Sequence, residues 1–191
     1  MRIGLDRRGR ERIHEDQRAF RRLLEAFAYP GRIVTLAEGR PAHAIVLETL
    51  ADAGTPLWIE DGFEAIRDRA AAARWPLTDQ GCCAFALCRV EALGCLDGFA
   101  MGTLADPHLS ATVVAEVAAL SGGAPFALSG PGVGPEGRVF APLGLPEAFP
   151  AAWARNNAAY PCGVDLILTA GPLCACLPRK TKLETTDVCS R

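Results

Sequence analysis

The sequence predicts a three-layer α/β/α fold, in which helices cover both faces of a mixed, mostly parallel sheet of about seven strands. In the first half of the chain, segments with helical periodicity alternate with short apolar segments, which is typical of crossover connections between parallel strands. The chain has 191 residues, half of them hydrophobic, which is sufficient for one buried core. Near the C-terminus only Gly171-Pro172 separates two apolar segments, which predicts an antiparallel hairpin.

Four helices are expected. The first begins at Asp16, a suitable N-cap, and ends before Pro30-Gly31. The apolar residues that are spaced as one helical face, and are therefore expected to be buried, are Phe20, Leu23, Leu24 and Phe27. The other three helices are expected at residues 42–52, 63–74 and 146–157.

Strands are expected where short apolar segments are bounded by glycine, proline or polar residues. Segment 82–88 is nearly all apolar, as in a strand that is buried on both faces. The glycine- and proline-rich segment 130–146 is expected to be irregular. The seven predicted strands lie at residues 32–36, 57–60, 82–88, 112–120, 126–129, 164–169 and 173–177.

The chain is expected to form one domain, residues 16–183, after a flexible basic arm at 1–15 and before a tail at 184–191. The arm is interpreted as a solvated terminus, with docking on an acidic partner or a phosphate as the alternative. A net charge of −2 argues against nucleic acid as a partner. No apolar segment approaches the length of a membrane span, and the charged start is not followed by the apolar segment of a signal peptide, so a cytoplasmic protein is expected.

The cysteines are expected to pack as small apolar residues in the core. They are not spaced as paired zinc knuckles, and the three histidines are not placed beside a cysteine pair. Metal binding and redox or nucleophilic use are the alternatives. The eight cysteines are Cys82, Cys83, Cys88, Cys95, Cys162, Cys174, Cys176 and Cys189.

Two cofactor classes are not favoured by the sequence. The segment Gly132-x-Gly134-x-x-Gly137 matches the dinucleotide fingerprint, but Pro135 interrupts it and no N-terminal βαβ unit surrounds it. A pyridoxal phosphate enzyme needs a lysine that forms the Schiff base. The only lysines, Lys180 and Lys182, are near the C-terminal end. No NAD, FAD or pyridoxal phosphate is therefore expected.

Two charged residues near the predicted hairpin are candidates for a site. Asp165 stands in an apolar strand, where a carboxylate needs a partner, so it contacts a ligand or forms a structural hydrogen bond or ion pair. Arg179 follows the last strand and is suited to a phosphate, with an exposed surface arginine as the alternative. Asp52 is interpreted as a local cap, Arg21 as part of a solvated helix face, and His108 as a surface residue.

Taken together, several segments resemble the PhnH subunit family of the bacterial carbon–phosphorus lyase system, over about residues 17–182. In order along the chain, segments that carry the resemblance are Phe20-Arg21-Arg22-Leu23-Leu24-Glu25-Ala26, Pro30-Gly31, Asp52-Ala53-Gly54-Thr55-Pro56, Gly102-Thr103, Gly130-Pro131-Gly132, Tyr160-Pro161-Cys162-Gly163-Val164-Asp165 and Leu177-Pro178-Arg179-Lys180-Thr181. Cys162 departs from the leucine common at its place in the family.

The resemblance implies a fold similar to the large domain of pyridoxal-phosphate-dependent transferases, but without that cofactor or its lysine. It also implies a homodimer that joins PhnG, PhnI and PhnJ subunits in a core complex. The complex, with ATP as a substrate, couples an alkylphosphonate to ribose with release of adenine, giving a ribose 1-phosphonate 5-triphosphate.

Family resemblance places the nucleosidase chemistry in the PhnI subunit, so this chain alone is expected to be inactive. A non-catalytic homodimeric scaffold and a free-standing nucleotide or phosphonate enzyme are the alternatives. The matched positions kept as ligand or interface candidates, without assigned catalytic roles, are Arg21, Asp52, Thr55, Gly102, Thr103, Asp165 and Arg179.

Overall fold

The main sheet has six strands in the order β1-β8-β7-β4-β3-β2, in a computed structural model that describes residues 7–185. Strands β2, β3, β4 and β7 are parallel to one another, whereas β8 and β1 are antiparallel to their neighbours. The bounds of these strands are Val34–Thr35 (β1), Leu57–Ile59 (β2), Phe85–Arg89 (β3), Thr112–Glu116 (β4), Asp165–Ala170 (β7) and Leu173–Leu177 (β8).

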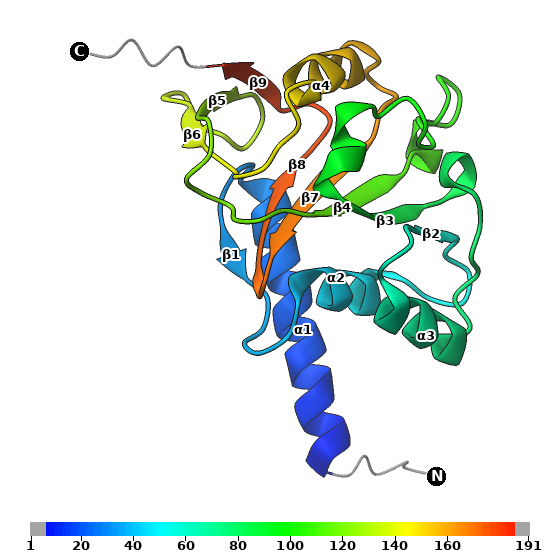
Figure 1. Cartoon of the computed structure of the whole chain (residues 1–191). Helices are drawn as coiled ribbons and strands as arrows, with labels where there is room; N and C mark the ends of the chain where they lie inside the picture. The colour runs from blue at the N-terminus through cyan, green and yellow to red at the C-terminus, as the bar shows by residue number, and fades with distance from the viewer. Residues whose placement is uncertain (1–6, 186–191) are drawn as a thin grey trace.

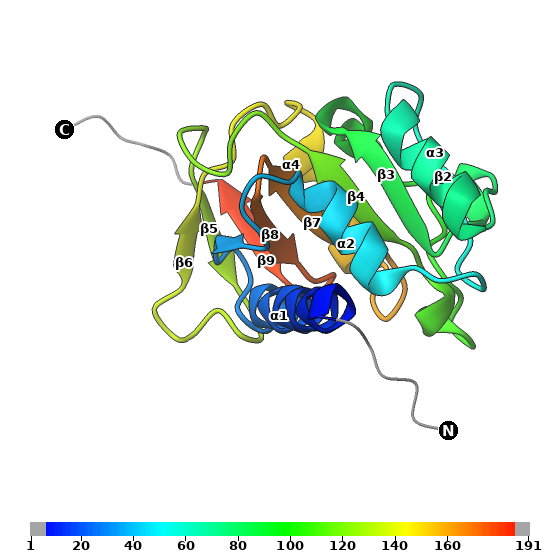
Figure 2. The ribbon, with the colours of Figure 1, turned by 90° about the horizontal axis from the view of Figure 1, so that it is seen from below.

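Helices cover one face of this sheet, and the other face is covered by a helix together with a small second sheet (Figures 1 and 2). Helices α1 (Arg7–Ala28), α2 (Ala42–Leu50) and α3 (Glu64–Ala73) lie on the first face. Helix α4 (Phe149–Ala158) lies on the second. Three short 3₁₀ segments complete the helical structure, at Gln80–Cys82, Val90–Gly94 and Pro107–Leu109.

The second sheet has the strand order β6-β5-β9 and is antiparallel throughout. Its strands are β5 (Phe126–Ser129), β6 (Arg138–Phe140) and β9 (Lys182–Thr185). Strand β9 follows β8 closely in the chain, so residues 178–181 connect the two sheets directly. This connection is the structural basis of the site described below.

The central strands are nearly all apolar because both of their faces are covered. In β7, Leu166 and Leu168 face the core on the α4 side, whereas Ile167 faces the core beneath α1 and α2. The same alternation follows from the pleat in β3 and β4. On the α4 side, Phe149 and Trp153 of α4 are fully buried.

The mixed sheet with helices on both faces is confirmed, but the number of strands in it is six rather than seven. The predicted strand 126–129 forms, yet it belongs to the second sheet. The predicted strand 112–120 ends at Glu116 because the chain then turns toward β5. Thr185 ends a strand that lies partly in the expected tail, and residues 186–191 are outside the described range.

Helix α1 differs from the prediction in its start and in its buried face. It begins at Arg7 rather than Asp16, so much of the predicted arm is helical. Arginine and glutamate, which are frequent in residues 7–15, have good helix propensity, which allows the helix to extend into this segment. The buried face consists of Ala19, Leu23 and Ala26, whereas Phe20 and Leu24 are exposed.

The other three predicted helices form within a few residues of the expected bounds, as does the hairpin at Gly171-Pro172. Helix α3 ends at a left-handed Arg74, two residues before Pro76. Among the described residues, no helix combines the length and the apolar character needed to cross a membrane.

Candidate functional site

A cavity of about 620 Å³ opens where β8 ends and β7 begins. Five segments that are distant in sequence line it: residues 27–28, 107–108, 131–132, 160–161 and 178–181. It is called the Arg179 pocket here. Because β4 and β7 start beside it, the pocket lies at the amino ends of these parallel strands. Ligands of open α/β sheets more often bind at the carboxyl ends.

An ion pair with Asp165 holds Arg179, which lines this pocket. Nη2 and Nε of Arg179 lie 2.6 and 3.2 Å from Oδ2 of Asp165, and the backbone N–H of Arg179 donates to Oδ1 over 2.7 Å. The hairpin register brings the two residues close, because Leu166 stands opposite Leu177, so that Asp165 lies level with Pro178 and next to the residue after it, Arg179.

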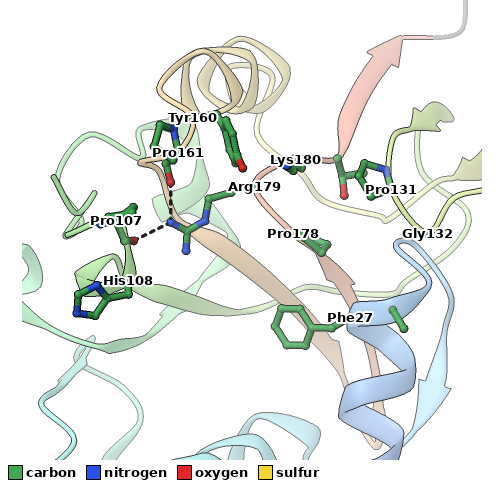
Figure 3. A pocket seen from close by; sticks show the side chains of 12 residues that line it. Phe27, Pro107, His108, Pro131, Gly132, Tyr160, Pro161, Pro178, Arg179 and Lys180 are labelled. Atoms are coloured by element: carbon green, nitrogen blue, oxygen red, sulfur yellow. Dashed lines mark hydrogen bonds between the residues drawn. The ribbon is translucent and has the colours of Figure 1, made fainter. Parts of the chain in front are cut away.

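The guanidinium of Arg179 is also bound by two loops. Its Nη1 donates to the carbonyl oxygens of Pro107 and Pro161 over 3.1 and 3.2 Å, as Figure 3 shows. The side chains of Arg179 and Asp165 retain only 16% and 22% of their exposure. Most of the donors of Arg179 are therefore used to hold the pocket together, which agrees with the structural alternative for Asp165.

Helix α4 holds the pocket segment from behind. The indole N–H of Trp153 donates to the carbonyl oxygen of Thr181 over 2.8 Å, and the amide of Asn157 donates to the same oxygen over 3.1 Å and to that of Arg179. The neighbouring Asn156 is buried and bonds both backbone groups of Val164, just before Asp165. Residues 178–181 are thus fixed on both sides.

The side of the pocket that faces solvent is aromatic and carries a positive charge. The Lys180 ammonium lies 4.4 Å from the centroid of the Tyr160 ring, a cation–π contact. Phe27, from the end of α1, lies on the opposite side of the pocket, and His108 lies at its edge (Figure 3). The Thr181 hydroxyl is buried and has no hydrogen-bond partner within the described chain.

The sequence of the chain matches that of known proteins. A family model described as "Bacterial phosphonate metabolism protein (PhnH)" matches residues 9–184. The chain belongs to the PhnH family. The subunit PhnH of alpha-D-ribose 1-methylphosphonate 5-triphosphate synthase from Rhizobium meliloti (strain 1021) is 39% identical to it over 189 residues, covering 90% of this chain and 92% of the relative.

A second relative carries a different name. HtxG of Stutzerimonas stutzeri, described as a candidate C-P lyase subunit, is 35% identical over 178 residues, covering 88% of this chain and 85% of that protein. The resemblance inferred from the sequence is therefore confirmed. Three of the segments that carry this resemblance contribute residues to the Arg179 pocket. They are Gly130-Pro131-Gly132, Tyr160-Pro161 and Pro178–Thr181.

Gly102 and Thr103 shape the loop that reaches the pocket. Gly102 has a φ of +71°, and a Cβ atom there would lie 3.1 Å from the carbonyl oxygens of Asp106 and Pro107. The Thr103 hydroxyl accepts a hydrogen bond from the backbone N–H of Asp106 over 3.0 Å. These two residues line no part of the pocket, but they position Pro107, whose carbonyl oxygen binds Arg179.

The other candidate residues of the PhnH-family chain lie apart from this pocket. Oδ1 of Asp52 accepts hydrogen bonds from the Gly54 N–H over 2.9 Å and the Thr55 hydroxyl over 2.7 Å, in the turn between α2 and β2. The Thr55 and Gly54 hydrogen bonds lower the pKa of Asp52. This is the local cap that the sequence analysis predicted for Asp52. Arg21 is exposed on α1 and lines a different hollow.

The cysteines do not form a metal site among the residues that the structure describes. Four are buried, namely Cys83, Cys88, Cys174 and Cys176, as expected for core packing. Burial raises the pKa of the Cys83 thiol to about 11. Cys82 and Cys95 are exposed and Cys162 is half-buried, so the core interpretation does not hold for them. Cys189 is outside the described residues.

The glycine-rich segment is not a dinucleotide loop. Residues 132–137 lie in the turn between the antiparallel strands β5 and β6, so the element that follows directly is a strand and not a helix. A Cβ atom at Gly132 would overlap the carbonyl oxygen of Ala28 at the end of α1. The glycine is therefore explained by the close approach of this loop to α1, beside the Arg179 pocket.

Sequence reasoning missed part of the pocket. Phe27 was expected in the core, and Tyr160 and Lys180 were not singled out, although all three line the cavity. The buried Asn156 and the bonded Asn157 were also missed. Two consecutive asparagines inside a helix were the available signal, because asparagine is unfavourable there unless its amide has a partner.

Proposed function

We propose that this chain is a subunit of a carbon–phosphorus lyase core complex that couples an alkylphosphonate to ATP. In this reaction a phosphonate oxygen bonds to the anomeric carbon of ribose while the bond to adenine breaks, giving adenine and ribose 1-phosphonate 5-triphosphate. The observation that carries the proposal is the 39% identity to a subunit of alpha-D-ribose 1-methylphosphonate 5-triphosphate synthase, over 90% of this chain.

The chain alone is proposed to be inactive, with the bond-breaking chemistry on a partner subunit. Displacement at an anomeric carbon needs a positioned acid for the leaving group and a group that stabilises the developing charge. The carboxylate behind the pocket, Asp165, is fully engaged with Arg179. His108 forms no ion pair or hydrogen bond with another pocket residue, so within the described part of the chain the pocket offers no acid–base pair.

The proposal includes a fold like the large domain of pyridoxal-phosphate-dependent transferases, without the cofactor. Both lysines support the absence of a Schiff base. Lys182 is exposed on β9, and Lys180 is exposed at the pocket with its ammonium over Tyr160. A lysine that forms a Schiff base with the cofactor would need to lie inside an enclosed site, and neither lysine does.

The proposed partners are a second copy of the chain and the PhnG, PhnI and PhnJ subunits. Helix α1 offers an apolar surface for such contacts: Ile13, Phe20 and Leu24 are 40%, 45% and 53% exposed and follow one side of the helix. These three residues are called the α1 stripe. Exposed apolar side chains that gather on one face are typical of protein–protein contacts. The stripe, and the structural use of Arg179, favour a purely structural scaffold as the second candidate.

The test is adenine release from ATP and methylphosphonate by the partner subunits, purified with and without this chain. Loss of adenine release on omission, restored when the chain is added back, is the expected result. Full activity of an intact complex without the chain would contradict the proposal. If the chain is required, variants that assemble normally but release adenine slowly would exclude the scaffold candidate.

A further inference from the structure

We infer that the Arg179 pocket binds a nucleotide, with the base against its aromatic side chains and a phosphate at Lys180. The inference rests on the proposed function, in which ATP is a substrate of the complex. It goes further by giving this chain its own contact with the nucleotide, at a pocket that is formed by its residues alone.

The size of the pocket favours a nucleotide over the other substrate. A volume of about 620 Å³ lies within the ~300–1,000 Å³ usual for small-molecule sites. An alkylphosphonate such as methylphosphonate has only a handful of heavy atoms and would leave most of this space to water. A base with its ribose and phosphate is of the right size.

The walls of the pocket favour a flat, apolar group. Phe27 and Tyr160 lie on opposite sides with Pro178 between them, and Pro131 adds apolar surface at a further side (Figure 3). Phe27 is only half-buried, so its ring keeps area to offer a ligand. Stacking of a base on an aromatic side chain is favourable for every base, because each has a π face.

The charges of the pocket favour one phosphate group. Arg179 is neutralised by Asp165, which leaves Lys180 as the pocket residue whose positive charge has no acidic partner in the described part of the chain. An ammonium group binds a phosphate as a point charge. The buried Thr181 hydroxyl beside it has no hydrogen-bond partner either. A ligand hydroxyl or phosphate oxygen would satisfy this group, which is otherwise costly to bury.

A segment of a partner polypeptide is the competing occupant. An extended peptide is usually held by a row of backbone hydrogen bonds or by a long groove. Here the unpaired polar groups of the pocket, Lys180 and Thr181, are consecutive residues at one place. This arrangement suits a compact anionic ligand better than an extended chain.

The experiment is calorimetric titration of the full chain with ATP, AMP, adenosine and methylphosphonate. We expect ATP and AMP to bind, adenosine to bind more weakly, and methylphosphonate not to bind. Replacing Phe27 by alanine should weaken adenosine and ATP alike, by about tenfold, and Phe27→Leu should not restore the loss because the flat ring is absent. Lys180→Ala should weaken ATP and AMP by about tenfold but leave adenosine unchanged.

The matched control is Lys182→Ala, because Lys182 is the only other lysine and does not line the pocket. It should leave all affinities unchanged. No saturable ATP binding, or ATP binding that Phe27→Ala leaves unchanged, would overturn the inference. If Phe27→Ala instead prevented co-purification with the partner subunits while ATP bound nowhere on the chain, the pocket would be a protein contact.

The two proposals fail separately. Adenine release that needs the chain, together with no ATP binding by the chain, would reject the nucleotide pocket and leave the proposed function in place. ATP binding with the predicted pattern, together with full adenine release when the chain is omitted, would support the nucleotide pocket and reject the proposed function.

Discussion

Replacement of Arg179 by alanine should destabilise the fold, because it removes the group that joins two loops to the start of β7. The variant leaves the Asp165 carboxylate without its guanidinium partner, in a place where only 22% of that side chain is exposed. It also removes the hydrogen bonds to the carbonyl oxygens of Pro107 and Pro161. Asp165→Asn should act in the same direction, since its amide would place a donor against the guanidinium.

The expected magnitude follows from the burial of the pair. Removing one partner of a fully buried ion pair costs about 3–5 kcal/mol. Because the two side chains keep 16% and 22% of their exposure, solvent compensates part of the loss, and about 2–4 kcal/mol is expected. For a chain of this size that free energy corresponds to a fall in Tm of roughly 5–15 °C.

Thermal unfolding followed by circular dichroism measures this change. The control is Arg155→Ala, because Arg155 forms only an exposed contact with Asp97, at 3.9 Å. That control is expected to change the unfolding free energy by less than about 0.5 kcal/mol. If Arg179→Ala lowered Tm no more than the control does, the guanidinium would not stabilise the fold, and a direct role in ligand binding would become the better explanation.

Three further outcomes are expected. Gly132→Ala should lower Tm more than Gly134→Ala, since both have positive φ but only Gly132 would clash with α1; equal losses would contradict this. Burial lowers the pKa of His43, so stability should be full above pH 6.5 and fall as pH drops below it; in urea titrations His43→Gln should flatten that slope. Because burial raises the pKa of Cys88 strongly, an aromatic disulfide reagent should label Cys82 in the native chain and Cys88 only after unfolding.

The parallel core and the hairpin could be predicted because local patterns determine them. Apolar segments bounded by turns identified β2, β3, β4, β7 and β8. The two-residue loop between β7 and β8 left one possible pairing for these two strands. That pairing also brings the ion pair within reach: once Leu166 stands opposite Leu177, Asp165 lies level with Pro178, one residue before Arg179. The two charged residues were identified separately, although the predicted hairpin was sufficient to join them.

Other features depend on contacts that no local pattern contains. Strand β5 pairs with β9, which is distant in sequence, so the second sheet was not predicted. In α1 the apolar spacing correctly predicted a helix, but it did not identify which side of that helix packs on the sheet. The buried face is built on Ala19 and Ala26, because small side chains allow the helix to approach the sheet closely, and Phe20 therefore remains outside. The Arg179 pocket, assembled from five segments, was beyond sequence reasoning for the same reason.

The short outer strands of the main sheet limit the ways in which copies of the chain can associate. Strand β1 has two residues and β2 has three, so each border of the sheet presents few free backbone N–H and C=O groups. Long, flat edge strands are the usual template for aggregation by strand addition. This main sheet is therefore a poor template for the addition of strands from another chain, so the proposed contacts between copies are expected to use side-chain surfaces such as the α1 stripe.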